Sequence, residues 1–487
     1  MSNEFFNQND LIEEKKPVRL IILLLINFSV YVNFYQFFAI SSYPFTLFDF
    51  SYILLICYSM YELFWLKKSI TLPKTVLLSS LFLLLVVFLI SIAYPVYSGN
   101  STYIYQFFKT YLHFIYLVGL ALILVFFGFS KYELNQVIKM LIYTSILVNI
   151  FGIYQIFARI LDLPFGFIEF NNINIVGDEK FANEIITEQA ILSFGNFYRV
   201  TSVFSEPSAI ASYNCIIFIL LFIPVINNTT SFIKNKLVYN VSLILCLLNI
   251  FLSFSNTGLF TLFCIFLFII FVDKKIKLSK FLYYLMLFIF IIFLSDYIIY
   301  EFTGTSVLEL FTKRLYGIIY YIFTGNNQRM TNGESFDTRA DNFGKMLDIW
   351  NYYPITGIGL GMIKYNGLFD IKYSEHFLSS VIAEVGLQGL LVFVFFFVVL
   401  FYYGYSITKN YQINPNIKEE DKNIYSILLY LILIVIIINW ISGNQFVGSY
   451  NWIIISIIYG IIINYFKDNN MPFIKIDLFK KSKSDLS

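Results

Sequence analysis

Hydrophobic residues along this chain form long runs separated by short polar stretches. A run of about 17 to 25 apolar residues is long enough to cross a hydrocarbon core of about 30 Å as an α-helix. The pattern therefore predicts an all-α polytopic membrane protein, with residues 1–487 forming a single integral membrane domain of about twelve transmembrane helices. The predicted spans are 19–40, 49–66, 75–95, 107–129, 136–160, 206–226, 237–254, 257–273, 281–300, 378–404, 424–441 and 447–466.

Composition agrees with this pattern. Hydrophobic residues make up 58% of the chain and charged residues only 13%, whereas soluble domains carry about 25% charge. This excludes a soluble enzyme, a secreted disulfide scaffold and a disordered regulator. The net charge of +2 gives no reason to expect a nucleic-acid partner. Four cysteines inside apolar runs and only two histidines predict no metal site, and we expect no cofactor.

Lysine and arginine predict the orientation, because cytoplasmic loops carry an excess of both. The outer loops 41–49 and 95–106 contain neither residue. We therefore expect both termini to be cytoplasmic, with the first span retained as an anchor because no small-residue cleavage site follows it. The residues placed inside by this frame include Lys15, Lys16, Arg19, Lys67, Lys68, Lys74, Lys131, Lys139, Lys234, Lys236, the loop 405–423 and the lysine-rich tail.

Two outer loops are much larger than the others, namely 161–205 and 301–377. Their basic residues do not contradict the orientation, since long loops escape the charge rule. The sequence contains no internal repeat or inverted pair of broken helices of the transporter kind. We therefore expect the chemistry to lie in these two loops.

The first large loop ends with Tyr198-Arg199 and then Ser-Glu-Pro at 205–207. Pro207 suits the first position of a helix, with Ser205 or Glu206 as its cap. Arg199 beside that helix start could form an anion site with the free N–H groups. The alternative, at about even weight, is an interfacial arginine that reaches the lipid headgroups beside an ordinary helix start.

The second large loop opens with an amphipathic stretch that is expected to lie flat on the membrane. Asp337 is then a good N-cap, which places Arg339 in the first turn of a helix ending near Tyr352. A cation in that turn is unfavourable unless an anion joins it, so Arg339 is a ligand candidate. A salt bridge to Asp337 or Asp341 is the alternative. The apolar stripe of the amphipathic stretch is Leu308, Phe311, Leu315, Ile319 and Ile322, with Glu309, Lys313 and Arg314 outside it.

Three further motifs flank these loops. The run Gly357-Ile-Gly-Leu-Gly361 lacks the strand–helix context of a nucleotide loop and predicts a tight turn. His376 lies at the outer mouth of a predicted span, and Glu384 lies deeper in it, where a carboxylate is a functional candidate by default. A capping histidine and a glutamate paired with another helix are the alternatives. Asn256 belongs to a polar hairpin between two spans.

Taken together, these motifs resemble the bacterial O-antigen polymerase and O-antigen ligase family. The resemblance covers about residues 190 to 400 and rests on three ordered pieces: Arg199 to Pro207, Arg339 ahead of 352–361, and His376 running into 384–389. Many members of the family carry arginine after the serine of the hairpin, where this chain has Asn256. Either another residue supplies that charge here, or the hairpin contributes only hydrogen bonds.

The resemblance implies a glycosyltransferase C-type fold and an inverting, metal-independent enzyme at the outer face of the bacterial plasma membrane. Its partners would be an undecaprenyl diphosphate-linked oligosaccharide, membrane lipids and a chain-length regulator. We expect Arg199 and Arg339 to bind the diphosphate and His376 to act as the base, with Glu206 as the second choice. The supporting residues are Tyr198, Asp337, Glu384 and Asn256.

The function that we predict is therefore a polysaccharide polymerase for O-antigen or capsule, which joins repeat units on the lipid carrier. One alternative is an O-antigen ligase that moves the glycan to lipid A core or to a protein. An alternative of another class is a flippase or transporter for lipid-linked glycans, and a non-catalytic scaffold is the remaining one. Few charges in the predicted spans and large outer loops argue against transport.

Overall fold

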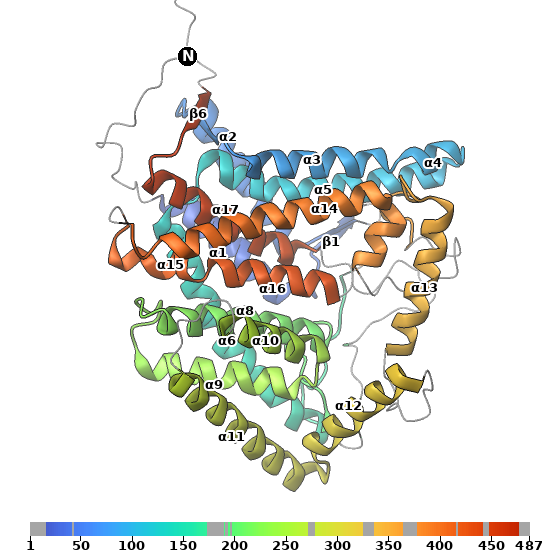
Figure 1. Cartoon of the computed structure of the whole chain (residues 1–487), viewed down its shortest axis with the longest axis vertical. Helices are drawn as coiled ribbons and strands as arrows, with labels where there is room; N and C mark the ends of the chain where they lie inside the picture. Colours follow the sequence, from blue (N-terminus) through green and yellow to red (C-terminus); the bar gives the residue numbers. More distant parts are fainter. Residues whose placement is uncertain are drawn as a thin grey trace, which may run out of the picture.

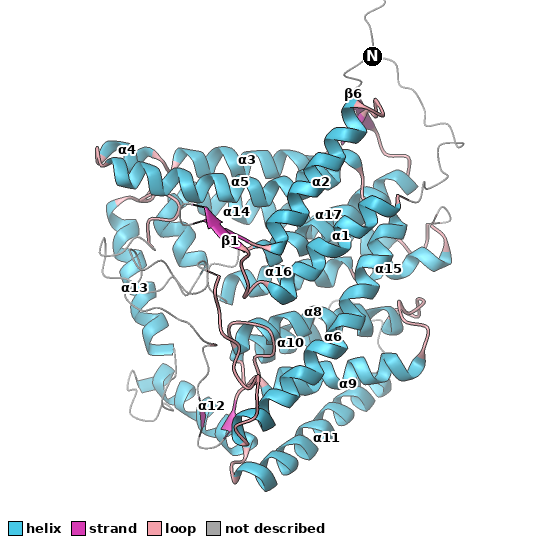
Figure 2. Cartoon of the chain, turned by 180° about the vertical axis from the view of Figure 1, so that it is seen from behind, coloured by secondary structure: helices cyan, strands magenta, loops and turns pink. Residues whose placement is uncertain are grey.

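The computed structural model shows a predominantly helical protein (Figures 1 and 2). Three short antiparallel strand pairs accompany the helices: β1 (Phe38–Ile40) with β2 (Tyr43–Phe45), β3 (Ile70–Pro73) with β6 (Phe473–Ile476), and β4 (Ser193–Phe194) with β5 (Phe197–Tyr198). The structure describes residues 16–40, 43–172, 189, 193–194, 197–270, 278–324, 336–363, 377–414, 417–441 and 448–476.

The helices follow the predicted apolar runs along the chain. They are α1 (Pro17–Phe28), η2 (Ser29–Val32), α2 (Leu47–Phe64), α3 (Val76–Ile90), α4 (Ala93–Tyr97), α5 (Ser101–Phe127), α6 (Lys131–Ile160), α8 (Pro207–Ile226), α9 (Lys236–Leu252), α10 (Asn256–Phe268), α11 (Leu278–Thr303), α12 (Val307–Thr324), α13 (Phe336–Tyr352), α14 (Phe377–Asn410), η4 (Glu419–Asp421), α15 (Lys422–Ser426), α16 (Leu428–Ile441) and α17 (Ser449–Asp468).

Each predicted span coincides with a helical segment, which confirms an all-α polytopic membrane protein. Within the described part of the chain, eight helices are long and apolar enough to cross a membrane. The segment 17–32 and helices α9 and α10 are shorter apolar helices. The number of twelve spans stays a prediction.

Local sequence signals explain where several helices begin. Ser130 and Glu133 form a capping box at the start of α6, because each side chain accepts a hydrogen bond from the other residue's backbone N–H. The Asn100 side chain accepts the N–H of Thr102 at the start of α5. Pro207 occupies the first position of α8, as predicted.

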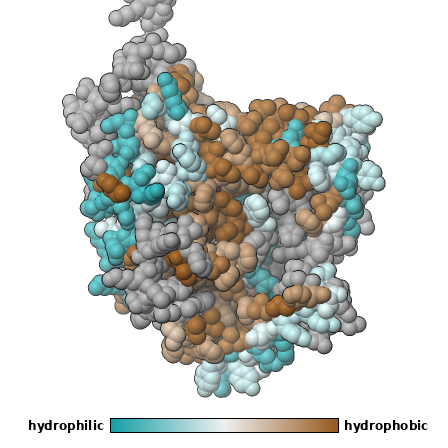
Figure 3. All heavy atoms as spheres, viewed as in Figure 1, coloured by the Kyte–Doolittle hydropathy of each residue, from teal (hydrophilic) through white to brown (hydrophobic). Residues whose placement is uncertain are grey.

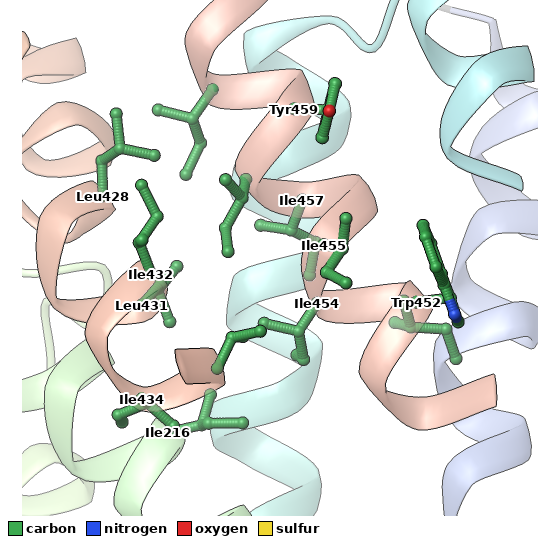
Figure 4. Close-up of a cluster of buried hydrophobic side chains, with 14 of the residues drawn as sticks. Ile216, Leu428, Leu431, Ile432, Ile434, Trp452, Ile454, Ile455, Ile457 and Tyr459 are labelled. Carbon is green, nitrogen blue, oxygen red and sulfur yellow. The ribbon is translucent and has the colours of Figure 1, made fainter. Parts of the chain in front are cut away.

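The helices pack in two groups that share an interface (Figure 1). In the upper group, α14 packs along α3 and α16, α17 packs along α5, and α1 packs along α2. In the lower group, α9 packs along α8 and α6, and α11 packs on α9. Contacts of α16 with α8 and α10 join the groups, and the core between them is aliphatic, with Ile216, Leu431 and Ile454 facing one another (Figure 4).

The surface shows the hydropathy pattern of a membrane protein. In Figure 3 a hydrophobic region covers the middle of the visible face, and hydrophilic residues gather toward its left and right sides. Helix α3 carries exposed apolar residues such as Val86 and Leu83. Side chains of this kind suit lipid tails, so the helices α3, α5 and α14 are expected to run across the membrane.

One end of the bundle, hereafter the lysine end, is held together by buried ion pairs. Glu62 of α2, only 1% exposed, pairs with Lys16, and burial lowers the pKa of Lys16 to about 8. Arg19 of α1 donates through Nε to Oε1 of Glu133 at 2.7 Å. Lys131 Nζ lies 3.0 Å from Asp421 Oδ2 and 2.9 Å from Asp468 Oδ1.

These contacts bring together segments that the lysine pattern places on one side of the membrane. The β3–β6 pair adds to them, because it joins the turn before α3 to the segment after α17. The grouping fits the predicted alternation of loops, and the cytoplasmic assignment of this end stays a prediction.

Buried amides bridge the helices inside the apolar interior. Asn149 of α6 and Asn214 of α8 donate to each other's side-chain oxygens at 2.9 Å in both directions. Asn439 of α16 and Asn451 of α17 form a second reciprocal pair at 3.1 and 3.3 Å. Side-chain hydrogen bonds of this kind contribute about 0.6–2 kcal/mol each between helices in a membrane.

Candidate active site

The turn between α9 and α10, at the end of the bundle opposite the lysine end, joins two distant parts of the sequence. Arg199 donates through Nε to the carbonyl oxygen of Ser253 at 2.9 Å, and the N–H of Val200 donates to the carbonyl of Leu252 at 3.2 Å. Carbonyl groups at the end of a helix lack intrahelical partners and readily accept such bonds. The structure thus fixes the predicted ligand Arg199 to the predicted polar hairpin, hereafter the 252–256 turn.

Helix α12 brings a second arginine to the same turn. Arg314 donates through Nη1 to the carbonyl oxygen of Phe254 at 2.9 Å, and its guanidinium lies 5.2 Å from the centre of the Phe254 ring. Its side chain is 8% exposed, whereas the neighbouring Lys313 is exposed and paired with Glu309. Arg199 and Arg314 therefore bond to adjacent carbonyls.

Sequence reasoning assigned no role to Arg314 and placed it only outside the apolar stripe of its helix. The structure turns this residue inward, while Leu315 and Ile319 of the predicted stripe are exposed. Exposed apolar residues fit a helix that lies on a membrane surface, which stays a prediction. No sequence signal identifies the partner of Arg314, because that partner is a backbone carbonyl 60 residues away.

A third arginine, Arg159 at the end of α6, holds the strand that carries Arg199. Arg159 is 7% exposed and donates to the carbonyl oxygens of Gly166 at 2.6 Å and Arg199 at 2.7 Å. It also donates to Gln189 Oε1 at 3.0 Å and Thr201 Oγ1 at 2.8 Å. All four of these oxygens are neutral, so they orient this buried cation without a carboxylate.

Gln189 completes the support of this strand. Its Nε2 donates to the carbonyl oxygens of Ser202 at 2.6 Å and Phe204 at 2.8 Å, while its Oε1 accepts from Arg159. The segment from Arg199 to Phe204 is therefore held by hydrogen bonds from Arg159 and Gln189. Sequence reasoning missed both residues, because Arg159 read as part of a span and Gln189 as part of a loop.

The other predicted residues of the first loop lie close along the chain. Glu206 is the N-cap residue of α8, half-buried, and its side chain does not cap the helix. The Tyr198 ring meets the Phe167 ring edge-on at 6.2 Å. Asn256 is the first residue of α10 and is half-buried. Tyr198 precedes Arg199, Glu206 lies two residues after Phe204, and Asn256 lies three residues after Ser253. Their chemical roles stay predictions.

The glycine run and the start of α14 form one interlocked unit. Gly357, Gly359 and Gly361 have φ values of 66°, 102° and 81°, which other residues rarely adopt. The backbone N–H of Gly359 donates to the carbonyl of Glu384 at 2.8 Å. A Cβ atom at Gly361 would lie 2.2 Å from Oγ1 of Thr110 on α5. The predicted tight turn is therefore confirmed, packed between α5 and α14.

Glu384 takes part in this unit directly. Its carboxylate, buried at 2% exposure, accepts the N–H of Ile363 at 3.1 Å. Gly386, two residues later, has a φ of 73° and kinks α14 where Leu387 donates to the carbonyl of Pro354. The structure gives Glu384 a role in holding the glycine run, in addition to the site role that the sequence suggested.

The remaining predicted residues are described only in part. Helix α13 begins at Phe336, so Arg339 lies in its first turn as predicted, and Asp337 is inside the helix and not its cap. The helix ends at Tyr352, as Pro354 predicts. The side chains of Asp337 and Arg339 and the whole of His376 lie outside the described residues. Helices α12 and α13 both stand at the end of the bundle where the 252–256 turn lies (Figures 1 and 2).

A comparison with known protein families gives a match that covers part of this region. Residues 241–394 match the family model described as O-antigen ligase. The match includes the 252–256 turn, Arg314, the glycine run and Glu384, whereas Arg159, Arg199 and Glu206 precede it. A search of the curated proteins finds no match to the chain.

Proposed function

We propose that this chain, whose residues 241–394 match the family model described as O-antigen ligase, is a glycosyltransferase that polymerises oligosaccharide repeat units carried on undecaprenyl diphosphate. The observation that carries the proposal is the arrangement around the 252–256 turn. Arg199 and Arg314 bond to its carbonyls, and Arg159 holds the strand of Arg199. The lysine pattern predicts that this end of the bundle faces the outside of the plasma membrane.

The arginines suit the chemistry of a diphosphate leaving group. A hydroxyl oxygen of the acceptor sugar attacks the anomeric carbon of the donor, the bond from that carbon to the diphosphate oxygen breaks, and the configuration inverts. Negative charge grows on the departing lipid diphosphate and must be stabilised. Guanidinium groups remain charged and bind phosphate oxygens through paired N–H donors. We assign the stabilisation of this charge to Arg199, together with Arg339 and Arg314.

Arg159 acts on the diphosphate through another residue. Its four neutral partners include the carbonyl oxygen of Arg199, so it fixes the backbone from which the Arg199 side chain extends. We therefore assign it a positioning role. The proton of the attacking hydroxyl goes to His376 in this scheme, with Glu206 as the second choice, because histidine and carboxylate side chains both serve as general bases.

A ligase is the second candidate, and the description of the matched family model favours it. In that reaction the same diphosphate leaves, but the accepting hydroxyl belongs to lipid A core or to a protein. Purified enzyme with the lipid-linked repeat unit alone separates the two functions. A polymerase forms a ladder of products without any added acceptor, and a ligase forms product only when lipid A core is supplied.

The same assay tests the base. His376→Gln is expected to lose turnover while still binding the lipid-linked donor, because glutamine can hydrogen-bond but cannot carry the proton. The rate of the unmodified enzyme should fall on the acid side near the ordinary histidine pKa of about 6.5. The matched control is His113→Gln on α5, which changes the chain's other histidine and should leave turnover intact.

Near-normal turnover in His376→Gln would transfer the base role to Glu206, and Glu206→Gln would then have to be inactive. Normal turnover in both variants would remove both residues from the proton transfer. The scheme would then reduce to stabilisation of the diphosphate by arginine.

A further inference from the structure

A cavity of about 750 Å³ lies on the lysine-end half of the molecule, away from the 252–256 turn. Its walls come from the first half of α6, the turn between α8 and α9, and the start of α15, which lie near one another in Figure 2. Ligand sites typically have volumes of about 300–1,000 Å³. Its polar lining residues include Lys139, Lys234, Lys236, Asn135, Asn240 and Asn423.

The charged side chains that line this cavity are positive. Lys139, Lys234 and Lys236 line it, and among the described residues its lining contains no aspartate or glutamate. Within the described residues, these three lysines take part in no ion pair, in contrast to Lys16 and Lys131 at the same end. Three lysines around one hollow attract an anion, and a phosphate group accepts bonds from several ammonium groups at once.

One amide oxygen in the cavity walls has no hydrogen-bond partner among the residues that the structure describes. The Oδ1 atom of Asn135 is buried and accepts no hydrogen bond among the described residues. Asn227 does not line the cavity, but it lies two residues after the lining residue Val225, is 5% exposed, and has neither its Nδ2 nor its Oδ1 bonded among the described residues. Buried polar atoms almost always have a hydrogen-bond partner, so an amide oxygen beside the cavity offers an acceptor to a polar molecule that enters it. An acceptor such as Asn135 Oδ1 calls for a ligand that also carries a hydroxyl donor.

The position of Lys139 along α6 indicates the level of the membrane at which the cavity lies. Lys139 and Arg159 lie on the same helix, twenty residues apart. At 1.5 Å per residue this separation is about 30 Å, which equals the thickness of a hydrocarbon core. If Arg159 lies at one membrane boundary, Lys139 lies at the headgroup level of the opposite leaflet. Phe232, Ile233 and Val225 give the cavity an apolar side against which the start of an acyl chain can pack.

We infer that this cavity binds the headgroup of an anionic phospholipid, with its phosphate between the lysines and a headgroup hydroxyl on Asn135. Phosphatidylglycerol has this combination of a phosphate diester and free hydroxyls. The lipid would hold the turn between α8 and α9 against α6 and α15, at the leaflet opposite the arginines.

The test measures lipid binding by native mass spectrometry of the full chain in neutral detergent. The probes are phosphatidylglycerol and phosphatidylcholine with identical acyl chains. The unmodified protein should prefer phosphatidylglycerol. The triple variant Lys139→Gln/Lys234→Gln/Lys236→Gln should lose about fivefold in affinity per lysine, and therefore on the order of a hundredfold in total.

The matched control removes the same charge from exposed lysines outside the cavity, as Lys67→Gln/Lys74→Gln/Lys409→Gln, and should change the affinity less than about twofold. Equal losses in both triple variants would overturn the site, as would equal binding of phosphatidylcholine. Displacement of the lipid by millimolar inorganic phosphate would overturn the lipid in favour of free phosphate. If the triple variant does not fold, Lys139→Gln alone should show the fivefold loss, and unchanged affinity there overturns the proposal.

Discussion

The two ends of this helix bundle hold their buried and half-buried cations in different ways. At the lysine end, Lys16, Arg19 and Lys131 each contact a carboxylate. At the opposite end, Arg159 bonds to four neutral oxygens, and Arg199 and Arg314 bond to the carbonyls of the 252–256 turn. A carboxylate cancels the charge that it orients, whereas a carbonyl orients the charge and leaves it positive. The paired charges of the first end stabilise the fold, and the second end is where we propose that an anionic ligand binds.

The largest effect is expected from breaking an ion pair at the lysine end. Arg19→Ala leaves Glu133 buried without its bidentate partner, which typically costs about 3–5 kcal/mol. We expect much less folded protein, measured by size-exclusion chromatography and thermal unfolding in detergent, with normal turnover per folded molecule. The apolar double variant Arg19→Met/Glu133→Leu should recover most of the stability, because neither charge is then left buried.

The control for this prediction is Lys74→Ala, which removes an exposed cation from the same end and should leave unfolding within about 0.5 kcal/mol. An Arg19→Ala protein as stable as the unmodified one would contradict a structural role for this pair. Loss of turnover without loss of folded protein would contradict the contrast between the ends.

Arg199→Ala and Arg339→Ala should show the reverse behaviour, with normal folded protein in the membrane and little polymer. Losing one charge-assisted contact in a site shielded from water costs about 3 kcal/mol, or about a hundredfold in rate. Arg→Lys should rescue poorly, because the two-pronged contact is lost. The measurement is polymer formed per molecule of purified enzyme. Full activity in either alanine variant would remove that residue from the site.

Substitutions of two adjacent residues of α12, the buried Arg314 and the exposed Lys313, separate the effect of the contact from the effect of the charge. Losing a hydrogen bond from a charged group costs about 1.5–3 kcal/mol, so we expect turnover in Arg314→Ala to fall at least about tenfold. The adjacent exposed residue offers a matched control, and Lys313→Ala should stay within about twofold. Equal effects of the two substitutions would indicate that the net charge of α12 matters and the contact with the 252–256 turn does not.

The smallest effect concerns the glycine run, which packs between α5 and α14. Gly361→Ala introduces a Cβ atom at a φ of 81° and against Thr110, which should cost about 1–2 kcal/mol of stability. Gly344→Ala on α13 has open space around it and a helical backbone, so it should raise stability by up to about 1 kcal/mol. Thermal unfolding of both variants checks the opposite signs, and a shared sign would contradict the packing of the glycine run.

The sequence by itself determined the helices, because an apolar run of membrane length has no other way to satisfy its backbone in lipid. Local chemistry also set the boundaries at Pro207 and Tyr352, since proline and capping residues act on their immediate neighbours. The glycine turn was predictable for the same reason. Each of these features depends on residues close together along the chain.

Only the tertiary structure decided which cations lie near one another and which groups accept their hydrogen bonds. Arg314 and Arg159 carry no local signal, because their partners are carbonyl and amide oxygens that any sequence could supply. The Glu384 carboxylate likewise accepts a backbone N–H, that of Ile363 just after the glycine run, which packing delivers. Backbone groups are the same at every residue, so a contact with them leaves no pattern in the sequence, and only the packing of the helices selects it.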